Sequence, residues 1–299
     1  MTLSIEHATK KFGDFTAVDD LSLTVEQGQM HGFLGANGAG KTTSFRMILG
    51  LLNPNAGVIT WKGQPITYAA SPEIGYLPEE RGLYPKMKVL DQLVYLAQLR
   101  KMPASKAKQE ALVWLERFQV PHYAAKKVEE LSKGNQQKIQ LIASLLHNPS
   151  LLILDEPFSG LDPVNVEMLK SAILDFQKQG ATIVFSSHRM DHVEELCDNM
   201  TIMDQGKVVL GGSIREVKRS FGKQNVRIKM DEDLTSLKDT AGVVQFTKTH
   251  DGALFQITDE ETADRLLNES MKLGKLRHFA IEEPSLEEIF ISKVGKAYA

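Results

Sequence analysis

A phosphate-binding loop is the feature that most constrains this chain. The run GANGAGKTT spans Gly35 to Thr43 and places Gly35, Gly40, Lys41 and Thr42 at the fixed positions of the phosphate-loop pattern. Glycines let the loop curl so that backbone amides point at phosphates. The lysine supplies a mobile positive charge, and the threonine hydroxyl is a ligand for Mg²⁺. The sequence therefore predicts a nucleoside-triphosphate site.

The residues on either side of the loop supply the context that this motif requires. Apolar residues from His31 to Leu34 predict a strand before the loop, and the pattern from Ser44 to Leu52 predicts a helix after it. A helix that begins at the loop directs its free amides and its positive dipole end at the anion. The predicted triphosphate ligands from the loop are Gly35, Ala36, Asn37, Gly38, Ala39, Gly40, Lys41, Thr42 and Thr43.

Composition excludes several classes of protein. The formal net charge of -3 argues against a sequence-independent nucleic-acid binder, which is usually basic. The single cysteine, Cys197, excludes a disulfide framework and predicts a core thiol in a reducing compartment. No apolar run approaches the roughly 20 residues that span a bilayer, and the N-terminus has no apolar signal segment. We therefore expect another chain to supply the spanning segments of any membrane complex.

The first 215 residues predict an α/β domain with a P-loop NTPase (RecA-like) core. The apolar runs Leu151 to Leu154 and Ala181 to Phe185 are typical of parallel strands buried on both faces. Short strands expected between Leu3 and about Gly32, and a strand pair over residues 58–67, predict an antiparallel β-subdomain. Helical periodicity over about 88–146 predicts a helical subdomain.

Residues 216–299 predict a small C-terminal α+β accessory domain. Apolar residues alternate with polar ones around Ile228 and again around Phe255, as in half-buried strands, and a helical segment surrounds Leu266. The order strand, helix, two strands, helix, strand suggests a ferredoxin-like arrangement. A last helix is expected from Ser285 to Val294.

Two carboxylates close one of the buried strands. Asp155 and Glu156 follow Leu151 to Leu154, so they lie at the carboxyl end of a central strand, beside the phosphate loop. Asp155 is placed to hold Mg²⁺, and Glu156 is the candidate general base for an attacking water. His188 ends another strand and is the candidate to relay a hydrogen bond at the γ-phosphate.

A second anion site is predicted at the start of a later helix. In LSKGNQQK, Ser132 is a good N-cap and Gly134 leaves its backbone unobstructed. Taken alone, the segment is better explained by a simple helix cap. A second phosphate-binding helix end cannot easily face the loop's own ligand, so we expect it to face a nucleotide held by another copy in a symmetric dimer.

These segments, in this order, resemble the nucleotide-binding subunit of an ABC transporter. The matching motifs are Walker A (Gly35 to Thr43), the Q-loop (around Glu79), the signature (Leu131 to Asn135), Walker B (Leu151 to Glu156), the D-loop (Ser159 to Asp162) and the switch histidine (His188). The tail EPSLEEIF, Glu283 to Phe290, resembles the C-terminal extension of export ATPases of the sodium-export (NatA-like) and drug-export class.

The resemblance implies ATP and Mg²⁺ as cofactors and two ATP molecules clamped between two such subunits. The second subunit would be an identical copy, with a related subunit as the alternative. Ser132 and Gly134 would meet the partner's ATP, Asp162 would belong to the nucleotide site, and Phe12 would stack on adenine in place of an ordinary core role. The pair would drive an integral-membrane permease from the cytoplasmic face of the cell membrane, with no nucleic acid involved.

Three residues depart from the family pattern. Glu79 stands where the family has a metal-reaching glutamine, Lys133 replaces the first signature glycine, and Asn135 replaces the signature glutamine. A carboxylate can still ligate metal, so Glu79 joins Thr42 and Asp155 as a predicted metal ligand, and Glu80 is the alternative if the loop shifts by one. With the other groups present, hydrolysis is expected.

Two other classes of function compete with an exporter subunit. A soluble ABC-type ATPase acting on ribosomes or DNA is the first, but the ribosomal class resembles two fused cassettes and the DNA-repair classes insert long coiled coils. Between Glu79 and Leu131 this chain has room only for short helices. A P-loop GTPase or small-molecule kinase is the second. The sequence contains no NKxD segment, which GTPases use to recognise guanine, and a signature helix would be unexplained in this class.

Overall fold

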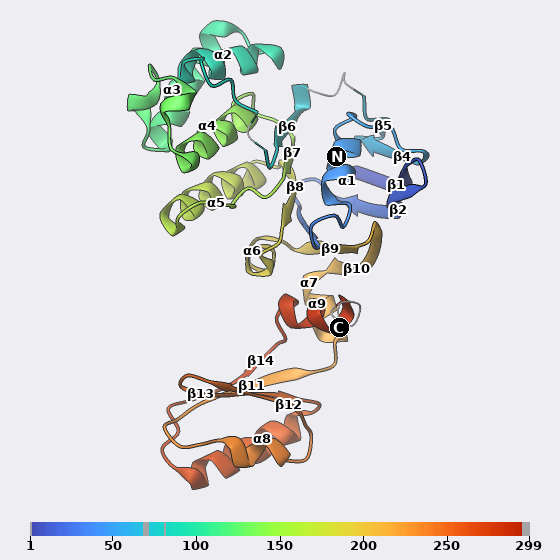
Figure 1. The fold of residues 1–299 in the computed structure, drawn as a ribbon, viewed down its shortest axis with the longest axis vertical. Coiled ribbons are helices and arrows are strands. Elements are labelled where there is room, and N and C mark those ends of the chain that lie inside the picture. Colours follow the sequence, from blue (N-terminus) through green and yellow to red (C-terminus); the bar gives the residue numbers. More distant parts are fainter. Residues whose placement is uncertain (1, 68–71, 81, 295–299) are drawn as a thin grey trace. The chain divides into compact units, whose positions relative to one another are not determined.

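The computed structural model describes residues 2–67, 72–80 and 82–294 and is drawn in Figure 1. The chain divides into two compact units, Met1–Gly211 and Gly212–Ala299. The division falls four residues before the boundary expected from the sequence. Among the described residues, no helix is both long and apolar enough to cross a membrane.

A six-stranded sheet forms the centre of the first unit, in the order β10-β9-β3-β8-β7-β6. The strands are β3 (Met30–Leu34), β6 (Ile74–Leu77), β7 (Leu151–Leu154), β8 (Thr182–Ser187), β9 (Asn199–Asp204) and β10 (Lys207–Ser213). The pairs joining β6, β7, β8, β3 and β9 are all parallel. Every residue of β3, β7 and β8 is buried, as the continuous apolar runs predicted.

An antiparallel sheet lies beside this core, in the order β2-β1-β4-β5. Its strands are β1 (Leu3–Phe12), β2 (Phe15–Val25), β4 (Ala56–Trp61) and β5 (Gln64–Pro65). The expectation of short strands was wrong for β1 and β2, which form one long hairpin. Register shifts along β1 and a left-handed His7 (φ 53°) interrupt its alternation, which hides the length of the strand in the sequence.

Helix α1 (Lys41–Ile48) packs between the two sheets. Phe45, Met47 and Ile48 are fully or almost fully buried there, in a core that also contains Leu3 of β1 and Ile153 of β7. Burial of this apolar face is the main force that fixes the helix at the end of the phosphate loop.

The helical subdomain contains α2 (Val89–Leu99), α3 (Ala104–Arg117) and α4 (Lys133–Leu145), with short 3₁₀ turns η2 (Pro121–Tyr123) and η3 (Val128–Glu130). Helices α5 (Pro163–Lys178) and α6 (Met190–Leu196) complete the first unit. Trp114 of α3 stacks on Phe176 of α5 with ring centroids 5.9 Å apart, which ties the helical subdomain to the helices on that side of the core.

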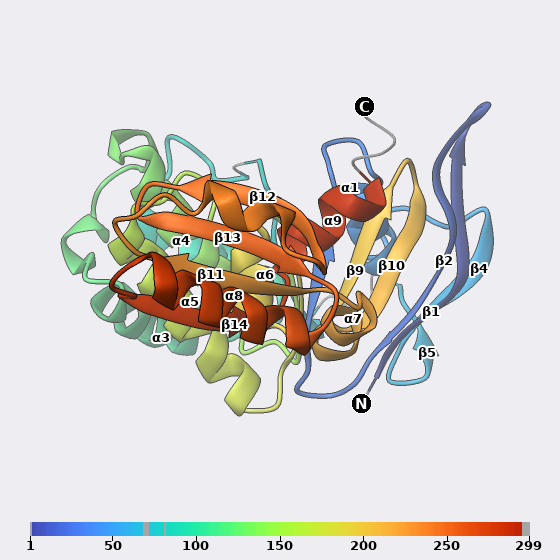
Figure 2. The same ribbon diagram turned by 90° about the horizontal axis from the view of Figure 1, so that it is seen from below.

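The second unit has the strand order of a ferredoxin-like sheet, β12-β13-β11-β14. Its elements are α7 (Ile214–Ser220), β11 (Gln224–Lys229), η4 (Thr235–Asp239), β12 (Val243–Thr249), β13 (Gly252–Ile257), α8 (Glu260–Leu273), β14 (His278–Glu282) and α9 (Leu286–Val294). Helix α8 crosses one face of the sheet (Figure 2), and Leu266 is fully buried there against Phe255 and Ile228.

The first helix expected in this unit is only a 3₁₀ turn. The connection between β11 and β12 is short, and Leu234 and Leu237 already close the core from η4. The expected helix is therefore present in position, as a short 3₁₀ turn that buries two leucines rather than as an α-helix.

Candidate nucleotide-binding site

The phosphate loop joins β3 to α1 through backbone that requires glycine. Gly40 has φ 105° and is the residue before the first helical turn, and an added Cβ there would lie 2.6 Å from the Ala17 carbonyl oxygen. At Gly35 a Cβ would lie 2.4 Å from the Met203 carbonyl oxygen. The loop is therefore closely packed against neighbouring backbone, with the N-terminus of α1 open for an anion.

Lys41 is buried at the start of α1 and is held by the loop itself. Its ammonium donates to the carbonyl oxygens of Gly35, at 2.6 Å, and Ala36, at 3.1 Å. Burial lowers the pKa of Lys41, and the carboxylates of Glu156, Asp155 and Glu79 oppose that shift. The ammonium is thus available to phosphate oxygens, which would replace the loop carbonyls as acceptors.

Asp155 follows β7 directly and is held from two sides. The Thr42 hydroxyl donates to Asp155 Oδ2 at 3.1 Å, and the buried Ser186 hydroxyl donates to Oδ1 at 2.5 Å. Hydroxyl and carboxylate oxygens are the hard ligands that Mg²⁺ prefers. Among the described residues no group of three His, Cys, Asp or Glu could hold a metal ion. The donor set fits Mg²⁺ bound by one or two side chains, with phosphates and water completing the shell.

Glu156 adopts a left-handed backbone, with φ 50°, and is almost completely buried. Its amide donates to Ser186 Oγ at 2.9 Å, and its carboxylate Oε2 lies 2.8 Å from His188 Nδ1. Burial raises the pKa of Glu156, and His188 and Lys41 partly oppose the rise. A carboxylate with a raised pKa is a stronger base, which suits proton abstraction from water.

These groups line one cleft of about 350 Å³. The residues that line it are Phe15, Ala17, Asn37, Gly38, Gly40, Lys41, Thr42, Thr43, Glu79, Asp155 and Glu156. The structure therefore brings the phosphate loop, the two carboxylates and Glu79 together. Ala36 and Gly35 contribute through the carbonyls that hold Lys41, and the Ala39 amide donates to Ala36.

The aromatic side chain in the lining is Phe15, which sequence reasoning missed, and not Phe12. The two residues are paired across the β1–β2 hairpin, and Phe12 is half-exposed with the Lys10 ammonium 5.4 Å from its ring centroid. The sequence did contain a signal for Phe15. A short turn at Gly13 pairs Phe12 with Phe15 across the hairpin, so either side chain could have been expected near the cleft. Ser186 was also missed, although it is a polar residue near the end of a central strand.

The signature and D-loop residues lie outside this lining. Ser132 caps α4, where its hydroxyl accepts from the Asn135 amide at 3.4 Å, and Asp162 caps α5, where it accepts from the Asn165 amide at 3.0 Å. At Gly134 the nearest atom to an added Cβ is a Leu161 methyl at 3.7 Å, so the backbone is open. Within one chain, Ser132, Gly134 and Asp162 therefore do not line the cleft that contains the phosphate loop.

Comparison with known proteins decides the family. The "ABC transporter" family matches residues 18–159. The uncharacterized ABC transporter ATP-binding protein YhaQ of Bacillus subtilis (strain 168) is 58% identical over 99% of this chain and 99% of its own length. The chain belongs to the ABC transporter ATP-binding proteins. The resemblance inferred from the motifs is confirmed.

Two further comparisons extend this assignment to the fold and to the second unit. The C-terminal domain family of DrrA1-3-like ATP-binding proteins matches residues 212–294. A solved ATP-binding subunit of an ABC transporter has a TM-score of 0.70 and 27% identity, over 74% of this chain and 94% of that one. The Nod factor export ATP-binding protein I of Burkholderia lata is 29% identical over 98% of this chain and 97% of its own length. The predicted fold class is therefore confirmed for this ABC transporter ATP-binding protein.

Proposed function

We propose that this protein binds and hydrolyses ATP with Mg²⁺, and that a pair of such subunits energises a separate membrane permease in export. The observation that carries the proposal is the Glu156 carboxylate, which is buried in the phosphate-loop cleft and contacts His188 at 2.8 Å. A buried carboxylate with a raised pKa has little structural use, because its ionisation is disfavoured by burial.

The roles of the side chains follow from their positions in the cleft. Glu156 accepts the proton of the attacking water, and His188 orients the carboxylate and donates toward the γ-phosphate. Lys41 exchanges the loop carbonyls for phosphate oxygens. Thr42, Asp155 and Glu79 would hold Mg²⁺, which would supply positive charge to offset the charge of the phosphates.

ATP is proposed to close two copies of residues 1–215, the ATPase domain, against each other. Ser132, Gly134 and Asp162 lie at helix starts outside the cleft of their own chain. In this proposal they contact the phosphate of a nucleotide that is bound to the phosphate loop of the second copy. The adenine would stack on Phe12 or Phe15 at the hairpin end. Residues 216–299 form the accessory domain.

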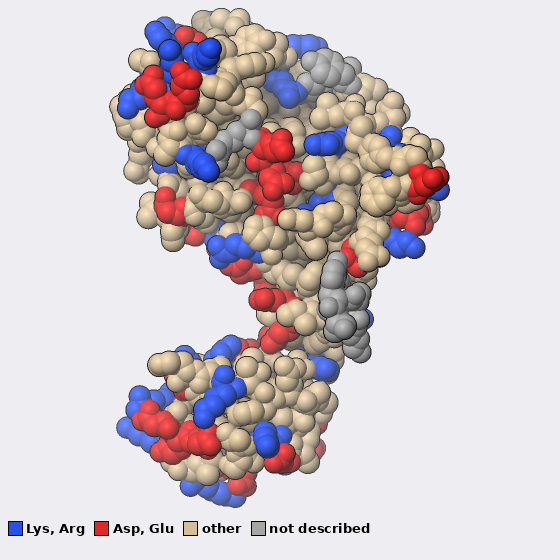
Figure 3. Space-filling model, viewed as in Figure 1, with Lys and Arg blue, Asp and Glu red and all other residues tan. Residues whose placement is uncertain are grey.

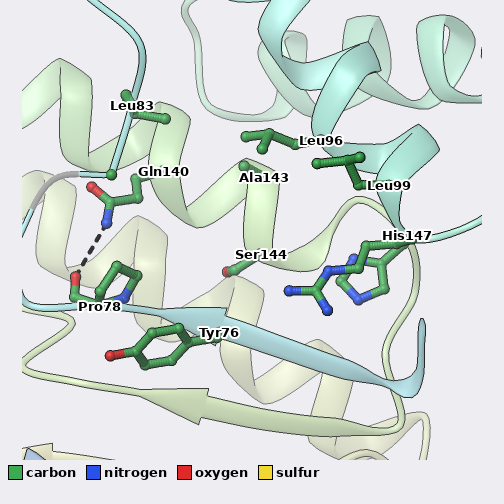
Figure 4. Close-up of a pocket in the computed structure, with 11 residues that line it drawn as sticks. Tyr76, Pro78, Leu83, Leu96, Leu99, Gln140, Ala143, Ser144 and His147 are labelled. Carbon is green, nitrogen blue, oxygen red and sulfur yellow. Dashed lines mark hydrogen bonds between the residues drawn. The ribbon is translucent and has the colours of Figure 1, made fainter. Parts of the chain in front are cut away.

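A groove beside the Q-loop is the proposed docking site for the permease. It has a volume of about 220 Å³ and lies between β6, α2 and α4 (Figure 4). Leu83, Leu96 and Leu99 supply apolar contacts, and Arg100 supplies a positive charge. A short cytoplasmic helix of a membrane protein that presents apolar residues would fit such a lining. In this proposal the protein works on the inner face of the cell membrane.

Export is favoured over action on ribosomes or DNA. A relative that matches nearly the whole chain is named for Nod factor export. On the face drawn in Figure 3, basic and acidic side chains are interspersed, whereas nucleic-acid binders gather basic residues in one area.

Affinity purification of the full chain from membranes solubilised in detergent tests the partner. We expect a multi-spanning membrane protein to co-purify. Recovery of ribosomes or DNA instead, with no membrane protein, would contradict the proposal. Phosphate release from Mg-ATP by the complex tests hydrolysis directly, and a complex that binds ATP without releasing phosphate would refute the enzymatic part.

A further inference from the structure

Gln140 makes a contact that the motifs do not explain. This residue lies on α4, two turns after the signature, and only 4% of it is exposed. Its side-chain Nε2 donates to two backbone carbonyl oxygens, those of Pro78 and Glu80, each at 3.2 Å. Figure 4 shows the amide pointing from α4 to Pro78 across the groove.

The two carbonyls flank Glu79 at the point where the chain leaves the sheet. The last sheet-type hydrogen bond is donated by the Asp155 amide to the Leu77 carbonyl, at 2.8 Å. Pro78 has no amide hydrogen to donate. Among the described residues, Gln140 donates to the backbone on both sides of Glu79. Gln140 therefore fixes the backbone on both sides of Glu79.

We infer that Gln140 is a positioning residue, which holds the Glu79 carboxylate in the cleft next to Thr42 and Asp155. This inference rests on the proposed metal role of Glu79. Glu79 lines the cleft with both of those residues, yet its own side chain has no hydrogen bond within the described residues. The position of the Glu79 carboxylate therefore depends on the backbone of residues 78–80, which Gln140 holds through its two hydrogen bonds.

A purely structural glutamine would be a poor choice at this position. Burying an amide is unfavourable unless its polar atoms are paired, and Gln140 Oε1 has no partner among the described residues. Leucine would fill similar space without an unpaired oxygen. The amide is therefore best explained by the two carbonyls that it holds.

Gln140→Leu tests the inference by removing both hydrogen bonds at nearly constant volume. The measurement is the dissociation constant for ATP by calorimetry, once with Mg²⁺ and once with EDTA. We expect the ATP affinity of the variant in EDTA to stay within about twofold of that of the unaltered protein. The factor by which Mg²⁺ raises the ATP affinity should fall about tenfold, because residues that orient metal ligands typically have effects of this size. The Mg²⁺ concentration for half-maximal hydrolysis should rise by a similar factor.

Two further variants separate positioning from structure. In a Glu79→Ala background, Gln140→Leu should leave the Mg²⁺ gain unchanged, because the carboxylate that it positions is gone. Ser144→Ala is the matched control, since Ser144 is buried on the same helix and lines the same groove but donates only to Leu141, at 2.7 Å, in its own helix. It should keep the full Mg²⁺ gain. Gln140→Met replaces Gln140→Leu if the leucine variant does not fold.

Equal loss of affinity with and without Mg²⁺ would overturn the inference, as would a full effect of Gln140→Leu in the Glu79→Ala background. Either result would assign Gln140 a structural role. Failure of the proposed function looks different, because the unaltered protein would then show no Mg²⁺-dependent ATP binding and no hydrolysis.

Discussion

Glu156→Gln is the substitution that separates catalysis most sharply from folding in this protein. The two side chains have the same shape, so the buried site keeps its packing, and glutamine can still hydrogen-bond His188, now 2.8 Å from the carboxylate. The variant loses the negative charge and the ability to accept a proton. Removing one general base lowers a rate about 10²- to 10⁴-fold, which corresponds to about 2.7 to 5.4 kcal/mol at about 1.36 kcal/mol per factor of ten.

The same substitution should stabilise the fold, and the sign follows from the pKa. Burial raises the pKa of Glu156 above its usual value of 4.5, so the folded protein resists ionisation more than the unfolded chain does. Above the raised pKa the ionised carboxylate therefore destabilises the native state. Glutamine removes this effect. The thermal midpoint of the variant should exceed that of the unaltered protein at pH 7, and the gap should close below pH 4.5.

Three measurements decide the matter: phosphate release, calorimetric ATP affinity, and gel filtration with saturating Mg-ATP. We expect phosphate release to fall about 10²- to 10⁴-fold, ATP affinity to persist, and an ATP-dependent dimer to accumulate. The matched control is Glu167→Gln on the exposed side of α5, where the carboxylate is 70% exposed, and it should leave all three unchanged. Full hydrolysis by Glu156→Gln, or a monomer at saturating ATP, would refute the reasoning.

Three other outcomes are expected. Lys41→Ala should weaken ATP binding about 10- to 150-fold, the value of a lost charge-assisted hydrogen bond of about 1.5 to 3 kcal/mol, and unchanged affinity in a titration would contradict the assignment. Glu79→Gln should keep or raise the hydrolysis rate, since an amide oxygen also ligates Mg²⁺, whereas a collapse of the rate would show that the carboxylate itself is needed. Leu266→Ala should destabilise the second unit by about 2 to 5 kcal/mol in calorimetry while ATP binding persists, and Met271→Ala, 63% exposed on the same helix, is its near-neutral control.

The parts of the fold that followed from the sequence are those fixed by local chemistry. The phosphate loop, the apolar strand before Asp155 and the cap at Ser132 each depend on a few adjacent residues, and the structure has the expected strand, loop and cap. Burial of Cys197 was also expected, and the thiol is buried at the residue that follows α6.

The missed features depend on residues that are distant in the chain. Ser186 bonds Asp155 across neighbouring strands, and Gln140 reaches the Q-loop from a helix some sixty residues away. Neither contact has a local signature, because a serine in a strand and a glutamine on a helix are common. Phe15 lines the cleft because the hairpin pairs it with Phe12. Register shifts along β1 interrupt its alternation of apolar and polar residues, so the length of this strand could not be predicted from the sequence. Pairing and register are properties of the sheet rather than of any short segment.

The left-handed backbone of Glu156 has a consequence for heat sensitivity. A residue other than glycine in that region stores about 1 to 2 kcal/mol of strain, which persists only while the surroundings enforce it. Here the enforcement comes from the Ser186 hydroxyl, 2.9 Å from the strained amide, at the end of two paired strands. On warming, local fraying of those strand ends would relax the turn well before the core melts. Turnover should therefore fade at temperatures where circular dichroism still reports an intact protein.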